Sequence, residues 1–88
     1  MIEKLENVTI VDVRTPEEYE GEQFPNALNI PLDEVAQRIE ELRKMKRPII
    51  FYCRSGNRSG MAVSILKQNG ISDAVNGGGL DDLKLNMQ

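Results

Sequence analysis

The sequence predicts an α/β protein, a small three-layer α/β/α sandwich around a central parallel sheet, on three observations. Apolar runs of strand length alternate with segments of helical periodicity along the chain, an order typical of parallel α/β folds. Residues 49–53 are apolar throughout, as expected for a central strand that helices cover on both faces. No repeat, linker or low-complexity tract interrupts the 88 residues, so residues 1–88 are expected to form a single domain.

The first half of the chain predicts a strand and two helices. Residues 8–13 are rich in β-branched side chains, which favour strands. Thr15 and Glu18 have the spacing of a capping box, with a proline at the first helical position between them. Asp33 is expected to cap a second helix, which should pack on the sheet. The apolar face of that helix, at positions i, i+4 and i+7, consists of Val35, Ile39 and Leu42.

The second half predicts the central strand and one longer helix. Pro48 precedes the apolar run at 49–53, and a helix is expected from about Ser59 to Asn69, with Ser59 as its N-cap. Gly70 follows as the left-handed residue that ends this helix. The residues that this helix should bury are Ala62, Ile65 and Leu66.

The only cysteine, Cys53, stands at the end of the apolar run and opens a polar, glycine-containing loop that leads into this helix. A lone cysteine at the end of a buried strand is most often a core residue, but the loop that follows favours a nucleophile. Free N–H groups and the positive end of the helix dipole stabilise an anion at a helix start, so we expect a lowered pKa for the thiol. Arg54 and Arg58 oppose that dipole unless something negative is bound nearby, which indicates an anionic ligand.

Spacing narrows the chemistry of this loop. Four residues separate Cys53 from Arg58, whereas cysteine-dependent phosphatases use Cys-x5-Arg, so the ring of amides is one residue shorter. A tighter ring suits a group smaller than phosphate, such as the outer sulfur of a persulfide. The loop resembles the active-site loop of the single-domain rhodaneses, the thiosulfate sulfurtransferase family. The residues that carry this resemblance are Cys53, Arg54, Ser55, Gly56, Asn57, Arg58 and Ser59.

The resemblance covers most of the chain, from about residue 11 to residue 83. Residues 11–14 and 16–19 are similar to the first strand of the family and the short helix after it. Residues 27–31 resemble its second strand, and residues 75–78 its last strand with a glycine turn. The stretch 21–27 lacks the histidine and the second glycine usual in the family, and the terminal tryptophan of the family is also missing.

This resemblance implies a sulfurtransferase without cofactor or metal. Cys53 would take the outer sulfur of a small anionic donor such as thiosulfate, hold it as a persulfide, and pass it to a thiol, cyanide or protein acceptor. The amides from Arg54 to Ser59 would stabilise the negative sulfur, as an oxyanion hole stabilises oxygen. Arg54 would attract the donor, Arg58 would complete the electrostatics of the loop, and Asp12 and Arg14 would support it structurally.

Composition excludes several other classes of protein. The sequence has no histidine and one cysteine, so hydrolytic triads, Cys-His pairs and the common transition-metal sites are not available. A net charge of −3 argues against direct nucleic-acid binding. No segment approaches the length of a membrane span, and residues 1–7 do not resemble a leader. We therefore expect a cytoplasmic monomer that does not bind membranes.

Two alternatives remain. A phosphatase or arsenate reductase could use the same thiolate, although the short loop disfavours both and the lack of a resolving cysteine disfavours the reductase. Alternatively, the domain could be a persulfide carrier or regulatory binding module with little turnover alone.

Overall fold

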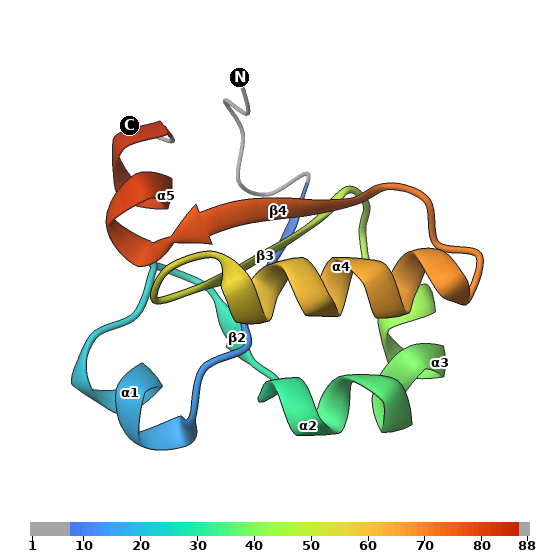
Figure 1. The fold of residues 1–88 in the computed structure, drawn as a ribbon, viewed down its shortest axis with the longest axis horizontal. Coiled ribbons are helices and arrows are strands. Elements are labelled where there is room, and N and C mark those ends of the chain that lie inside the picture. The colour runs from blue at the N-terminus through green and yellow to red at the C-terminus, as the bar shows by residue number, and fades with distance from the viewer. Residues whose placement is uncertain (1–7, 87–88) are drawn as a thin grey trace.

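Four parallel strands form the sheet at the centre of the computed structural model, which describes residues 8–86 (Figure 1). The strand order is β2-β1-β3-β4, so β1 and β3 are the central strands. Every strand pair is parallel, which confirms the predicted fold class. The strands are β1 (Thr9–Asp12), β2 (Leu28–Asn29), β3 (Ile49–Cys53) and β4 (Ala74–Gly79). Residues 1–7, in which no leader was expected, lie outside the described part.

Helical segments connect the strands, as expected for parallel neighbours, which need crossover connections. In chain order they are α1 (Pro16–Gly21), α2 (Leu32–Val35), a 3₁₀ turn η2 (Ala36–Arg38), α3 (Ile39–Arg43), α4 (Asn57–Gln68) and α5 (Leu80–Asn86). All five residues of β3 are buried, as the apolar run predicted for a strand covered on both faces.

Each face of the sheet has its own apolar core, because successive side chains of a strand point to opposite faces. One core joins the sheet to α2, α3 and α4, and its main members are Val11, Val13, Phe51, Cys53, Val35, Ile39, Leu42, Ala62 and Leu66. The other joins it to α5 and the segment that contains α1, through Ile10, Ile50, Tyr52, Phe24, Ala27, Leu80 and Leu83, with Tyr19 packed against them. The Cys53 side chain therefore lies on the α4 side of the sheet.

The predicted start of α1 and the predicted end of α4 are both confirmed. The Thr15 hydroxyl accepts a hydrogen bond from the Glu18 amide at 3.2 Å, and the Glu18 carboxylate accepts one from the Thr15 amide at 3.0 Å, so the capping box is formed. Gly70 has a φ of +83°. Its amide donates to the Lys67 carbonyl and the Ile71 amide to the Leu66 carbonyl, which is a Schellman ending of α4.

Two predicted N-caps are wrong. Asp33 is not a cap, because Pro31 with φ −55° and ψ 149° is already the N-cap and α2 begins at Leu32. Asp33 lies inside the first turn, where its charge still suits the helix dipole. The predicted second helix is also divided by η2, although Val35, Ile39 and Leu42 are buried as expected.

Ser59 is the second incorrect cap. The N-cap of α4 is Gly56, which has a left-handed backbone with φ +97°, and the helix begins at Asn57. The early start places Ser59 at the third helical position, fully buried. There its amide donates to the sulfur of Cys53 and its hydroxyl lies 3.5 Å from that sulfur, so neither group caps the helix.

Candidate active site

The sulfur of Cys53 lies at the base of the loop between β3 and α4, surrounded by hydrogen-bond donors. The Gly56 amide donates to Sγ at 3.0 Å and the Ser59 amide at 3.4 Å. The Ser59 hydroxyl lies 3.5 Å from the same sulfur. Cys53 is 1% exposed, so these loop atoms are its main polar surroundings.

Glycines allow the loop and the end of β4 to approach each other closely. Gly56 adopts the left-handed backbone region, and a Cβ added there would lie 3.4 Å from the Cα of Gly78. A Cβ added to Gly79 would lie 2.3 Å from the carbonyl oxygen of Arg54, a distance that real Cβ atoms do not adopt. The glycine run at the end of β4 is therefore a steric requirement of the cysteine loop.

Opposing effects act on the pKa of Cys53. Burial raises the pKa of the thiol, but hydrogen bonds from the Ser59 hydroxyl and from the amides of Ser59, Ser55 and Gly56 lower it. The donors outweigh burial, so the pKa of Cys53 lies below its ordinary value. The loop thus favours the thiolate, which is the nucleophilic form of cysteine.

Arg58 connects the loop to α1. Its guanidinium contacts the Glu18 carboxylate through two hydrogen bonds of 2.8 and 3.1 Å. These bonds, followed by the bond from the Thr15 amide, lower the pKa of Glu18 to about 2. Arg58 therefore pairs with an acidic group, and that group also belongs to the capping box of α1.

Asp12 and Arg14 form a buried ion pair beside the loop. The Asp12 carboxylate accepts from the Arg14 amide at 2.8 Å and from Arg14 Nη2 at 2.7 Å. Arg14 Nη2 also donates to the Glu22 carbonyl, and the guanidinium lies 5.6 Å from the Tyr52 ring centroid. The pair thus holds the segment between α1 and β2 against the carboxyl ends of the strands.

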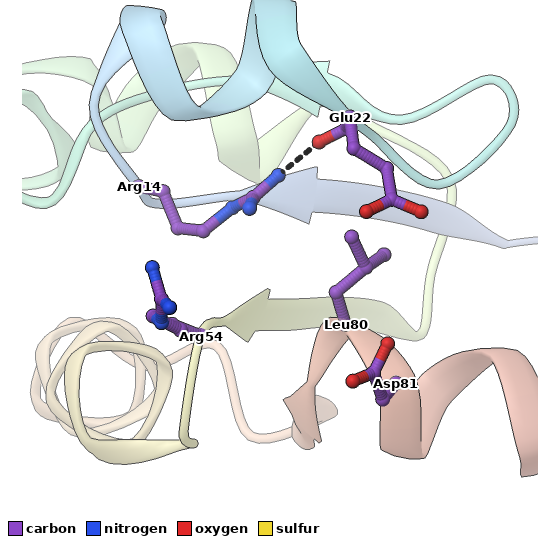
Figure 2. Close-up of a pocket in the computed structure, with 5 residues that line it drawn as sticks. All are labelled: Arg14, Glu22, Arg54, Leu80 and Asp81. Atoms are coloured by element: carbon purple, nitrogen blue, oxygen red, sulfur yellow. Dashed lines mark hydrogen bonds between the residues drawn. The ribbon is translucent and has the colours of Figure 1, made fainter.

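Arg54 faces a polar pocket of about 230 Å³ at this edge of the sheet (Figure 2). The Arg54 guanidinium lies at one end of the pocket, the carboxylates of Glu22 and Asp81 lie near Leu80 at the other, and the Arg14 guanidinium extends between them to the Glu22 carbonyl. Of these groups, Arg14 is paired with Asp12 and Glu22 with Lys84. The cationic end of the pocket is therefore formed by Arg54, the residue that follows Cys53 in the chain.

The remaining predicted loop residues have different surroundings. Ser55 is exposed and contributes its backbone amide to the sulfur. Asn57 is exposed at the first position of α4. Among residues 8–86 there is no group of three or more histidine, cysteine, aspartate or glutamate side chains that could hold a metal ion.

One residue of the site was missed by the sequence analysis. Asn76 of β4 connects the loop to the last strand through its side-chain amide, which contacts Gly56, Ser59 and Gly78. The sequence signal for it was weak, because an asparagine before a glycine run also fits an ordinary turn. Its role depends on the pairing of β4 with β3, which local patterns do not reveal.

Fold and site together define a class: parallel α/β proteins that present a cysteine thiolate in a ring of backbone amides at the carboxyl end of a central strand. The profile of one family, the Rhodanese-like domain, matches residues 1–84. The chain belongs to this rhodanese family, as the loop sequence predicted.

Individual relatives agree with this assignment. The chain is 41% identical over 76 residues to the thiosulfate sulfurtransferase PspE of Escherichia coli (strain K12). This match covers 85% of the chain and 73% of PspE. It is 39% identical over 71 residues to a sulfurtransferase of Allochromatium vinosum, covering 81% of this chain and 65% of the relative. A solved structure described as rhodanese with anions from E. coli superposes with a TM-score of 0.77 at 39% identity, over 85% of this chain and 89% of the other.

No helix within residues 8–86 is long and apolar enough to cross a membrane.

Proposed function

We propose that this protein is a sulfurtransferase that carries sulfane sulfur on Cys53. The observation that carries the proposal is the position of Sγ within hydrogen-bond distance of the Gly56 and Ser59 amides, at the end of a buried strand. The named activity of PspE supports the same reaction class.

In the proposed cycle, the Cys53 thiolate attacks the outer sulfur of thiosulfate. The new S–S bond forms as the S–S bond of the donor breaks, and sulfite leaves with the electron pair. The outer sulfur of the persulfide then carries the negative charge, which the amides of the loop stabilise. Attack on that sulfur by cyanide or by the thiolate of an acceptor breaks the persulfide bond and returns the Cys53 thiolate.

Arg54 and the Asp12–Arg14 pair have distinct roles in this proposal. Arg54 directly follows Cys53 in the chain and lines the pocket at the carboxyl edge of the sheet, so its charge would attract the anionic donor. Asp12 and Arg14 are buried and paired with each other, so their role would be to hold the edge of the sheet that presents the loop.

The surroundings of Arg58 favour sulfur transfer over phosphoester hydrolysis. An arginine that recognises phosphate does so with its guanidinium donors, but here both Nη atoms of Arg58 are bonded to Glu18. The same pairing holds the Arg58 guanidinium beside Glu18 of α1. A phosphate bound over the amides would have to compete with this ion pair.

Steady-state formation of thiocyanate from thiosulfate and cyanide tests the proposal. The protein should turn over many times, Cys53→Ala should be inactive, and Arg54→Gln should raise KM for thiosulfate several-fold. Arg38→Gln is the matched control, because Arg38 pairs with Glu34 and Glu41 on the exposed side of α2 and α3. A single stoichiometric discharge without turnover would indicate a persulfide carrier, and hydrolysis of phosphoesters without thiocyanate formation would contradict the proposal.

A further inference from the structure

The side chain of Asn76 connects three atoms of the cysteine loop and its surroundings. Nδ2 donates to the carbonyl oxygen of Gly56 at 3.1 Å, and Oδ1 accepts from the Gly78 amide at 2.9 Å and from the Ser59 hydroxyl at 2.6 Å. Asn76 itself is exposed on β4, an edge strand of the sheet. An exposed asparagine whose amide makes three hydrogen bonds is held in one orientation.

These partners fix which end of the amide faces Ser59. The Gly56 carbonyl can only accept and the Gly78 amide can only donate. A flipped Asn76 side chain would place Oδ1 against the Gly56 carbonyl oxygen and Nδ2 against the Gly78 N–H, and neither pair could form a hydrogen bond. Oδ1 must therefore face Ser59, and the hydroxyl must donate to it. At 2.6 Å this is a short hydrogen bond for two neutral groups.

The Ser59 hydroxyl has only one proton, but two acceptors compete for it. Its oxygen lies 3.5 Å from Cys53 Sγ as well as 2.6 Å from Asn76 Oδ1. While the proton points to Asn76, the oxygen presents a lone pair to the sulfur, which suits a neutral thiol that donates its own hydrogen. A thiolate needs the opposite arrangement, with the hydroxyl turned toward Sγ.

We propose that Asn76 is a positioning residue for sulfur transfer: its carbonyl holds the Ser59 hydroxyl away from Cys53 when the sulfur is neutral and competes with the thiolate for the same proton. The inference rests on the proposed function, because the charge on Sγ changes during the cycle. In the persulfide the negative charge moves to the outer sulfur, so the inner sulfur no longer needs the hydroxyl. Asn76 then regains its short hydrogen bond, and the persulfide is stabilised relative to the free thiolate.

The charged groups around the sulfur stay the same when Asn76 is replaced by alanine. These groups are Arg54 of the loop, Arg58 in the first turn of α4, Glu18 of α1, Asp12 at the end of β1, Arg14 just after it, Glu22 after α1, and Asp81, Asp82 and Lys84 of α5. A change in the pKa of Cys53 between such variants therefore reports on hydrogen bonds to the sulfur and on the geometry of the loop.

A double-mutant cycle separates these two effects. The pKa of Cys53 is measured from the pH dependence of its alkylation by iodoacetamide in the wild type, Asn76→Ala, Ser59→Ala and the double variant. We expect Asn76→Ala to lower the pKa by about half to one unit when Ser59 is present, since one competing hydrogen bond is removed. In the Ser59→Ala background the same replacement should leave the pKa nearly unchanged. An equal shift in both backgrounds, or none in either, would overturn the proposal.

Asn76→Asp provides a second variant with the opposite expected sign. It keeps an acceptor for the Ser59 hydroxyl and adds a charge, so it should raise the pKa of Cys53 both directly and through the hydroxyl. The rise should be smaller in the Ser59→Ala background, where only the direct effect of the charge remains, and an equal rise in both backgrounds would contradict the role of the hydroxyl. Urea denaturation of each variant verifies that it is folded.

The persulfide part of the inference has its own readout. At a fixed ratio of sulfite to thiosulfate, intact mass gives the fraction of Cys53 that carries the extra sulfur. Asn76→Ala should reduce the loaded-to-free ratio about three- to tenfold, and an unchanged ratio would contradict this part. If no variant accepts sulfur but the pKa cycle behaves as expected, the proposed function fails while the role of Asn76 in positioning the Ser59 hydroxyl stands.

Discussion

Replacing Glu18 by glutamine should destabilise the protein in a pH-dependent way. The pKa of Glu18 is lowered from 4.5 to about 2, first by the hydrogen bonds from Arg58. At about 1.36 kcal/mol per pKa unit, this difference sets an upper bound of about 3 kcal/mol. The Glu18 side chain is 25% exposed and that of Arg58 is 35% exposed, so solvent screening reduces the expected value to about 1 kcal/mol.

The sign of the pH dependence follows from the direction of the shift. A carboxyl whose pKa is lower in the folded state contributes stability that is complete above its unfolded pKa and is lost as the pH falls toward its folded pKa. The contribution of Glu18 should therefore be complete at pH 7, decline below about pH 4.5 and largely disappear near pH 2. Glutamine can still accept at the capping box, so Glu18→Gln removes the charge but keeps the cap.

Urea denaturation at pH 7, 4 and 2 measures this effect. Glu17→Gln is the matched control, because Glu17 is exposed in the same first turn of α1 and its replacement changes the charge near the helix dipole equally. We expect Glu18→Gln to be about 1 kcal/mol less stable than Glu17→Gln at pH 7 and equal to it near pH 2. Equal stability at pH 7, or a difference that persists at pH 2, would refute the assignment of this ion pair.

Three further predictions follow from the contacts around the loop. Gly79→Ala should lower the free energy of unfolding by about 1–3 kcal/mol, because the new Cβ meets a loop carbonyl oxygen at 2.3 Å, whereas Gly21→Ala, with nothing within 4 Å, should not destabilise in the same urea titration. Asp12→Asn should cost about 3 kcal/mol or more, because it leaves a buried guanidinium without a counter-charge, and the exposed control Glu41→Gln should cost far less, because solvent screens its ion pair; equal losses for the two would contradict the burial argument. Alkylation of Cys53 should have a midpoint at lower pH in the native protein than in urea, where the ordinary pKa of about 8.5 applies, and coincident midpoints would show that the loop does not stabilise the thiolate.

Features that depend on neighbouring residues were predictable from the sequence. The capping box at Thr15 and Glu18, the fully buried strand β3 and the left-handed Gly70 each follow from a local pattern. The position of Cys53 at the carboxyl end of a central strand follows from the order of strands and helices.

Features that depend on distant residues were not predictable in the same way. Arg58 was expected to complete the electrostatics of the loop, but its partner Glu18 is 40 positions away and is reached only because α1 lies beside the loop. Ser59 looked like an N-cap because its residue type suits one. The left-handed Gly56 takes that position instead, which releases the Ser59 hydroxyl to act between Cys53 and Asn76.

The segment that departs from the usual family pattern is held by two backbone hydrogen bonds as well as by the buried side chains of Phe24 and Ala27. Arg14 donates to the carbonyl oxygen of Glu22, and the amide of Phe24 donates to the Tyr52 hydroxyl at 2.9 Å. These bonds do not depend on the histidine and glycine that the sequence lacks here. The departure therefore leaves the support of the cysteine loop in place and changes the side chains that border it.

The central claim is that Cys53 accepts and releases one sulfur atom, and intact mass spectrometry tests it most directly. After incubation with thiosulfate, the wild-type protein should gain the mass of one sulfur and lose it on addition of cyanide, while Cys53→Ser should gain nothing. Absence of the adduct in wild-type protein whose Cys53 is readily alkylated would contradict the account.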